Sequence, residues 1–216
     1  MYIILFYCYM FAIFCAKKYS RATLFGKNIQ GSNQVILILY VSGICLLGIL
    51  PPIFSAYKPG EIFGGNTAPS KLQVLTCLAL CLIAVYTAIS EARKKAILPN
   101  FEYLPFSTSF IICFILIRII FLFSFELYFR GYLLRDFLEW LSPVSAVFLN
   151  ILLYTLIHLF SDRKELIACI PFGLTMCLLC LWIGAVWPAI LIHTSLGITH
   201  EGLLLYYNSR TLKSNT

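Results

Sequence analysis

The stretch that decides the fold runs from Ser107 to Phe129 and reads STSFIICFILIRIIFLFSFELYF. A helix needs roughly 20 mostly apolar residues to cross the hydrocarbon core of a bilayer, and this stretch is long enough. Its charged residues are Arg118 and Glu126. A charge at the centre of a bilayer costs at least ~2.5 kcal/mol on insertion scales. We therefore interpret the stretch as a transmembrane helix that carries functional groups.

Similar apolar runs lie on both sides of this stretch, near residues 2–16, 35–56, 72–90, 143–160, 166–184 and 186–206. The chain is 61% apolar and 12% charged, whereas a soluble domain is about half apolar and a quarter charged. The fold class is therefore all-α, a polytopic membrane helix bundle of about 6–8 transmembrane helices. No basic residue precedes the first run, so we expect a retained helix rather than a cleaved signal peptide.

Basic residues indicate the orientation, because cytoplasmic loops are enriched in Lys and Arg. Seven crossings with the N-terminus outside place most basic loop residues inside. The inside set is Lys17, Lys18, Arg21, Lys27, Arg93, Lys94, Lys95, Arg163, Lys164, Arg210 and Lys213, and the outside set is Lys58, Lys71, Arg130 and Arg135. The net charge of +7 is then explained by anionic membrane lipids as partners, and no nucleic acid is needed.

The chain shows no linker long enough to separate two domains, so residues 1–216 are expected to form a single integral membrane domain. Residues 1–98 are assigned to scaffold helices, because polar groups within apolar runs begin only beyond them. Residues 107–206 form the core that carries the candidate site. The loop from Ala56 to Lys71 contains two Pro and three Gly residues and is expected to be irregular and exposed.

Two polar clusters have helical spacing. Glu126 and Arg130 are four residues apart, which places them on one helix face where they can form a pair. An alternative interpretation is that the pair only stabilises the helix and takes no part in chemistry. Asn150, Tyr154 and His158 also recur every four residues and form a polar stripe.

Three other ionisable residues are not assigned a role in chemistry. Arg118 is interpreted as snorkelling or neutralising a neighbour. His200 and Glu201 lie close to the end of the last run, so we expect them at the membrane interface.

Spacing brings a carboxylate and an imidazole together. Glu126 lies sixteen residues before Ser142 and His158 lies sixteen after it, with Ser142-Pro143 as the expected turn. An antiparallel hairpin would place both at one depth, provided that the first helix continues toward Trp140. A carboxylate and a His can deprotonate a water, and a second His, here His193, can donate to an oxyanion. One carboxylate and two imidazoles are the minimum set of groups for amide hydrolysis without a covalent intermediate.

Three segments resemble the motifs of the CAAX-protease and bacteriocin-processing family. The segment from Glu126 to Gly131 resembles the first motif, in which two adjacent Glu are followed by three residues and Arg. The segment from Tyr154 to His158 is similar to the second motif, Phe, three residues and His. The segment from Trp187 to His193 looks like the Trp-Pro turn and the His of the third. The resemblance covers roughly Phe110 to Thr199.

The resemblance implies a polytopic, metal-independent glutamic endopeptidase that cuts peptides or proteins at the membrane. Four residues carry over as catalytic candidates, namely Glu126, Arg130, His158 and His193. No cofactor and no metal are expected. The expected partners are membrane lipids and a membrane-associated peptide or protein substrate. The expected location is multi-pass in a bacterial plasma membrane.

Two positions depart from the family pattern. The first Glu of the first motif, usually assigned as the water-activating base, is Phe125 here, and the third-motif Asn is Gly197. An alternative is therefore a catalytically inactive member that acts as a membrane scaffold or bacteriocin self-immunity protein. A zinc protease is disfavoured because the sequence has no HExxH helix. A small transporter is disfavoured because no inverted repeat is visible.

Overall fold

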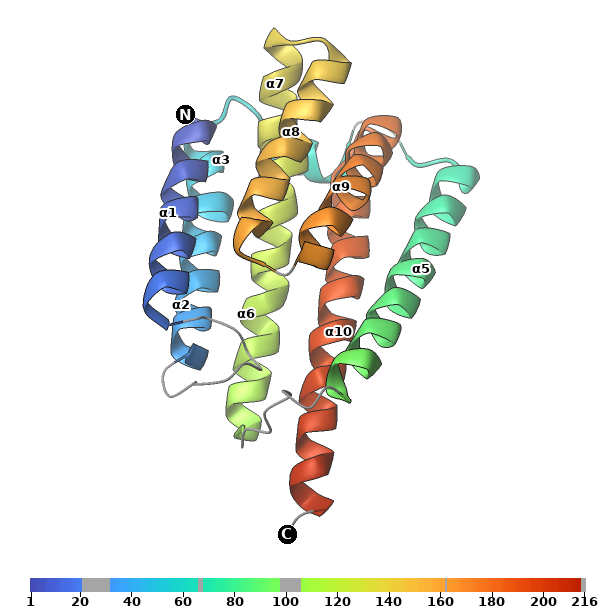
Figure 1. The fold of residues 1–216 in the computed structure, drawn as a ribbon. Coiled ribbons are helices and arrows are strands. Elements are labelled where there is room, and N and C mark those ends of the chain that lie inside the picture. The colour runs from blue at the N-terminus through green and yellow to red at the C-terminus, as the bar shows by residue number, and fades with distance from the viewer. Residues whose placement is uncertain (21–31, 66–67, 98–105, 162, 215–216) are drawn as a thin grey trace.

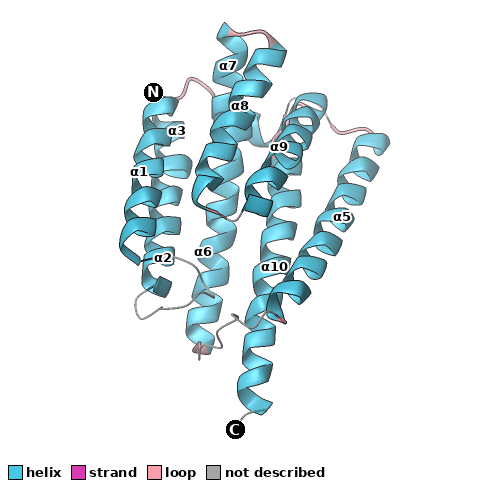
Figure 2. Ribbon diagram, viewed as in Figure 1, coloured by secondary structure: helices cyan, strands magenta, loops and turns pink. Residues whose placement is uncertain are grey.

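The computed structural model describes residues 1–20, 32–65, 68–97, 106–161 and 163–214. These residues form helices and connecting turns, with no strand among them (Figure 2). Within the described part of the chain, five helical segments are long and apolar enough to cross a membrane: Gln34–Phe54, Lys71–Ala96, Thr108–Trp140, Pro143–Phe160 and Arg163–Ile183. A shorter apolar helix spans Tyr2–Ala16. The prediction of an all-α, polytopic membrane bundle is confirmed, and the protein is an integral multi-pass membrane protein.

The helices follow the predicted apolar runs closely. Their bounds are α1 (Tyr2–Ser20), α2 (Ser32–Gly43), η1 (Ile44–Ile49), α3 (Leu50–Phe54), α4 (Pro59–Gly64), α5 (Lys71–Ala96), α6 (Thr108–Glu126), η2 (Leu127–Leu133), α7 (Leu134–Trp140), α8 (Pro143–Ile157), η3 (His158–Phe160), α9 (Arg163–Ile183) and α10 (Trp187–Ser214). In Figure 1, α6 lies between the α1–α2 pair and the α10–α5 pair, and the α8–α9 hairpin covers one side.

The central helix is longer than a bilayer needs. From Thr108 to Trp140 it contains 33 residues, which corresponds to roughly 50 Å at 1.5 Å per residue. The predicted continuation toward Trp140 is therefore confirmed. The predicted turn is also present, because Ser142 caps α8 by accepting a hydrogen bond from the backbone N–H of Ser145, with Pro143 in the first turn. Hence α8 runs back antiparallel to the helix before it.

A π-helical segment, η2, interrupts this central helix directly after Glu126. All seven of its residues are buried. The carbonyl of Phe129 accepts hydrogen bonds from the backbone N–H of Leu134 and from Asn150 Nδ2, the latter at 2.6 Å. Short π segments inside α-helices are frequent at functional sites. Here the segment changes the rotation of the helix between Glu126 and α7.

The loop from Ala56 to Lys71 is mostly exposed, as expected, but the expectation of an irregular backbone is wrong for Pro59–Gly64. Residues Pro59–Gly64 form α4, in which Ile62 is fully buried. The Ile62 carbonyl accepts a hydrogen bond from the N–H of Val186 at 3.1 Å. Pro in the first turn and Gly65 at the end, with φ of 68°, are favourable helix boundaries. The Pro and Gly residues here mark the two ends of a short helix and do not prevent it from forming.

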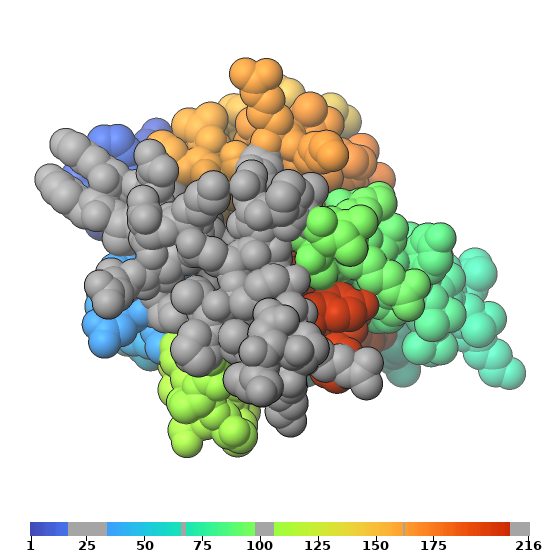
Figure 3. Space-filling view, turned by 60° about the horizontal axis from the view of Figure 1, so that its bottom comes forward, coloured from blue at the N-terminus to red at the C-terminus, as the bar shows by residue number. Residues whose placement is uncertain are grey.

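The basic ends of three helices lie at the same end of the bundle. The C-terminal ends of α1, α5 and α10 lie at the lower end of the bundle in Figure 1. Figure 3 views this end and shows the end of α5 (green) beside α10 (red), with the α8–α9 region (orange) on another side. Arg21 and Lys27, two residues used to predict the orientation, lie outside the described residues. The orientation stays a prediction.

Candidate active site

Helices α6 and α10 meet along a regular antiparallel seam. Glu126 contacts His193, one turn further Leu122 lies opposite Gly197, and after another turn Arg118 pairs with Glu201. A Cβ atom added to Gly197 would lie 2.9 Å from Leu122 Cδ1. Glycine at 197 therefore lets the two helices approach closely, at the position where the family motif has Asn.

The last step of the seam is a largely buried ion pair. The side chain of Glu201 is only 16% exposed and is bound by Arg118 through two contacts of 2.9 and 3.0 Å. The place of Glu201 at the membrane interface stays a prediction. The interpretation of Arg118 as neutralising a neighbour is confirmed. The Arg118 side chain projects from α6 into the bundle, and Glu201 balances its positive charge there.

Glu126 makes the closest polar contact of the site. Its Oε1 lies 2.5 Å from His193 Nδ1, and its Oε2 lies 3.4 Å from Arg130 Nε, with the carboxylate 0% exposed. The Arg130 guanidinium is buried as well and lies over the ring of Tyr154, 4.2 Å from the ring centroid. Among the described residues its nitrogens have no hydrogen-bond partner. The Arg130 charge is therefore balanced by Glu126 and the face of an aromatic ring.

The predicted stripe on α8 faces the same region. Asn150 donates to the carbonyl of Phe129 and accepts from Cys177 Sγ at 3.2 Å. Tyr154 lies under Arg130 and 5.2 Å from the ring of His158. The hairpin thus brings the α8 stripe against η2, as the symmetric spacing around Ser142 indicated.

Phe125 lies between the two imidazoles. Its ring centroid is 6.4 Å from that of His158 and 5.9 Å from that of His193, and both pairs are edge-to-face. Its side chain is only 2% exposed. The position that the family motif gives to its first Glu therefore faces both histidines, and in this chain an apolar ring occupies it.

The candidate residues consequently form one group. Glu126 contacts Arg130 and His193 directly, and His158 joins them through Phe125 and Tyr154. Sequence reasoning missed Glu165, whose Oε1 lies 3.0 Å from His158 Nδ1. A weak signal was available, because Glu165 is an acidic residue in the first turn of the helix that follows His158. No spacing rule, however, connects residues seven apart across a turn.

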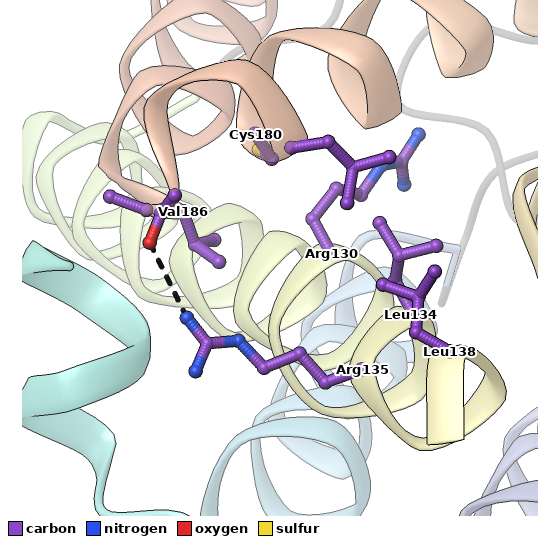
Figure 4. Close-up of a pocket in the computed structure, with 9 residues that line it drawn as sticks. Arg130, Leu134, Arg135, Leu138, Cys180 and Val186 are labelled. Atoms are coloured by element: carbon purple, nitrogen blue, oxygen red, sulfur yellow. Dashed lines mark hydrogen bonds between the residues drawn. The ribbon is translucent and has the colours of Figure 1, made fainter. Parts of the chain in front are cut away.

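A small cavity lies beside the site, between α7 and the end of α9 (Figure 4). Its volume is about 130 Å³. Arg135 covers one side, with Nη2 donating to the carbonyl of Gly184 at 3.4 Å. The lining residues are Arg130, Leu134, Arg135, Leu138, Cys180, Leu181, Gly184, Ala185 and Val186. The cavity therefore connects to the buried group through Arg130.

The site contains two carboxylate–imidazole pairs, Glu126 with His193 and Glu165 with His158. An ionised carboxylate only accepts hydrogen bonds, so each Nδ1 must carry the proton. In the neutral ring Nε2 is then an acceptor. Two such acceptors can take protons from a water molecule. Within the described residues, no group of three or more His, Cys, Asp or Glu side chains is arranged to hold a metal.

Comparison with known proteins agrees with the predicted family. The family model described as type II CAAX prenyl endopeptidase Rce1-like matches residues 107–198. This range includes Glu126, Arg130, His158 and His193, together with Phe125. No curated protein and no solved structure matches the chain in these comparisons. Residues 107–198, which form α6 to α9 and the first half of α10, are therefore similar to the Rce1-like family of type II CAAX prenyl endopeptidases.

Proposed function

We propose that the protein is an intramembrane endopeptidase that cleaves membrane-associated or exported peptide or protein substrates with a water molecule activated by a carboxylate and histidine. The Rce1-like match supports a CAAX-type intramembrane protease. The observation that carries the finer proposal is the 2.5 Å contact between Glu126 Oε1 and His193 Nδ1. A buried carboxylate held on an imidazole in this way leaves Nε2 free to act as a base.

In the proposed reaction, the oxygen of a water molecule attacks the carbonyl carbon of the scissile bond while its proton passes to His193 Nε2. Glu126 remains ionised, holds the Nδ1 proton and stabilises the imidazolium that forms, which is the task of the Asp in a Ser-His-Asp triad. The proton then passes to the leaving amine as the C–N bond breaks. Arg130 makes the Glu126 charge tolerable in an apolar environment.

His158 supplies the second imidazole of the proposed site. Its Nε2 is buried and has no hydrogen-bond partner among the described residues. Buried polar atoms in proteins nearly always have a hydrogen-bond partner, so a buried nitrogen without one needs an explanation. The proposal supplies one, because the water or the substrate would provide the missing partner.

A second candidate function is favoured by Phe125. An apolar ring lies where the family has a carboxylate, and it contacts both histidines. A catalytically inactive member that acts as a membrane scaffold or bacteriocin self-immunity protein accounts for this ring. Under either function we place the chain in a bacterial plasma membrane, with anionic lipids at its basic ends and without nucleic-acid partners.

The two functions are separated by a cleavage assay on the full chain in detergent micelles. The probes are an internally quenched peptide that ends in a prenylated Cys-aliphatic-aliphatic-X tail and the same peptide without the prenyl group. An active enzyme should lose at least ~100-fold in kcat in His193→Gln. The control Glu91→Gln removes an exposed acid that binds Lys94 and should retain parent activity. No cleavage of either peptide by the parent, with activity created by Phe125→Glu, would support the inactive member.

A further inference from the structure

We propose that Glu165 is a positioning residue that fixes the tautomer and orientation of His158 for catalysis. The proposal rests on the endopeptidase function above and adds to it a residue from outside the three motifs. Its basis is the 3.0 Å contact between Glu165 Oε1 and His158 Nδ1, which joins the end of α8 to the first turn of α9.

The backbone around His158 explains why its ring needs an external partner. His158 is the C-terminal cap of α8 and begins the 3-10 turn His158–Phe160. A residue at a helix end lacks the next turn of side chains that would restrict its ring. The ring packs on one side against Tyr154, and its Nδ1 edge is held by Glu165.

Holding Nδ1 determines where the other nitrogen lies. Because the carboxylate of Glu165 only accepts, it requires the proton on Nδ1, and the lone pair of the neutral ring is then on Nε2. That Nε2 atom is buried without a partner among the described residues, and the ring meets Phe125 edge-to-face. Glu165 thus leaves the acceptor on the buried edge of the His158 ring.

Glu165 is well placed to remain ionised while doing so. Its side chain is 54% exposed, whereas that of His158 is 20% exposed. It lies in the first turn of α9, where the helix dipole favours an anion. The arrangement repeats that of Glu126 with His193 on the other side of Phe125. A chain that lacks the first-motif Glu therefore still has a second carboxylate in its site.

The tautomer can be tested without any turnover, because the chain has only three His residues. The full protein is labelled with ¹⁵N-histidine in micelles, and imidazole signals are assigned with His193→Gln and His200→Gln. In the parent, His158 should show a protonated Nδ1 and an unprotonated Nε2. In Glu165→Ala, both signals should move toward the average of two tautomers while those of His193 stay in place. Unchanged His158 signals in this variant would overturn the proposal.

Kinetics test the catalytic consequence. With the peptides described above, Glu165→Ala should lower kcat by ~10-fold or more with KM nearly unchanged, and Glu165→Asp should recover part of the loss. A kcat equal to that of the parent would also overturn the proposal. Glu91→Gln serves as the matched control on another helix. If the parent cleaves neither peptide, the endopeptidase function and the catalytic part of this proposal fail together. The histidine signals then decide alone whether Glu165 fixes His158.

Discussion

Replacing Glu126 by Gln should destabilise the protein strongly, apart from any effect on cleavage. Glu126 and Arg130 are both 0% exposed and lie 3.4 Å apart. In the described residues, the guanidinium nitrogens have no hydrogen-bond acceptor, so Glu126 is the anion that balances them. Breaking a buried ion pair by removing one partner costs about 3–5 kcal/mol. For a chain of this size, that loss corresponds to a Tm decrease of roughly 6–20 °C.

The matched variant is the double replacement Glu126→Gln with Arg130→Met. It leaves no unpaired charge in the bundle, and replacing a buried pair by neutral groups is often close to neutral in stability. We therefore expect the double variant to be more stable than Glu126→Gln alone, with a coupling energy above ~1 kcal/mol. The measurement is helical circular dichroism during denaturation, in the same detergent, of the parent, Glu126→Gln, Arg130→Met and the double variant. Cleavage should be compared below the lowest Tm.

The reasoning would be refuted by either of two results. If Glu126→Gln lies within ~1 kcal/mol of the parent, the carboxylate does not neutralise a desolvated guanidinium. If the two replacements are simply additive, Glu126 and Arg130 are not energetically coupled, whatever their distance.

Three further outcomes are expected. Phe125→Glu should raise kcat at least ~10-fold, because it places a carboxylate between the two imidazoles; a well-folded variant with parent kcat contradicts the assigned geometry. Gly131→Ala should cost about 1–3 kcal/mol in the detergent unfolding assay, since its Cβ would lie 2.6 Å from Ile62 Cγ2; Gly60→Ala, whose Cβ meets nothing within 4 Å, is the control. Cleavage should survive strong chelators, and a loss that added zinc restores would indicate a metal enzyme.

The sequence by itself determined the architecture, for a reason that the bilayer supplies. Backbone groups in a membrane must be paired within the segment, so each long apolar run becomes a helix. The Ser142-Pro143 turn and the spacing around it also predicted that α8 returns along the central helix. The four candidate residues are among the polar groups that are costly in apolar runs, and the resemblance to the family motifs selected them from that larger set.

Only the tertiary structure decided which side chain of the first motif faces which histidine. Helical spacing places Phe125 and Glu126 about 100° apart but gives no absolute rotation. Packing against α8 and α10, next to a π-helical segment, sets that rotation. As a result Phe125 contacts both imidazoles, and Glu126 contacts His193 and Arg130.

Local sequence patterns likewise could not predict which carboxylate pairs with which histidine. Glu126 and His193 are 67 residues apart, and their contact depends on the register of α6 against α10, which the close approach at Gly197 permits. The pairing of His158 with Glu165 depends on how the chain turns between α8 and α9. Apolar periodicity specifies which face of a helix is buried. It cannot specify the neighbour that the face meets, because that is decided by the packing of the whole bundle.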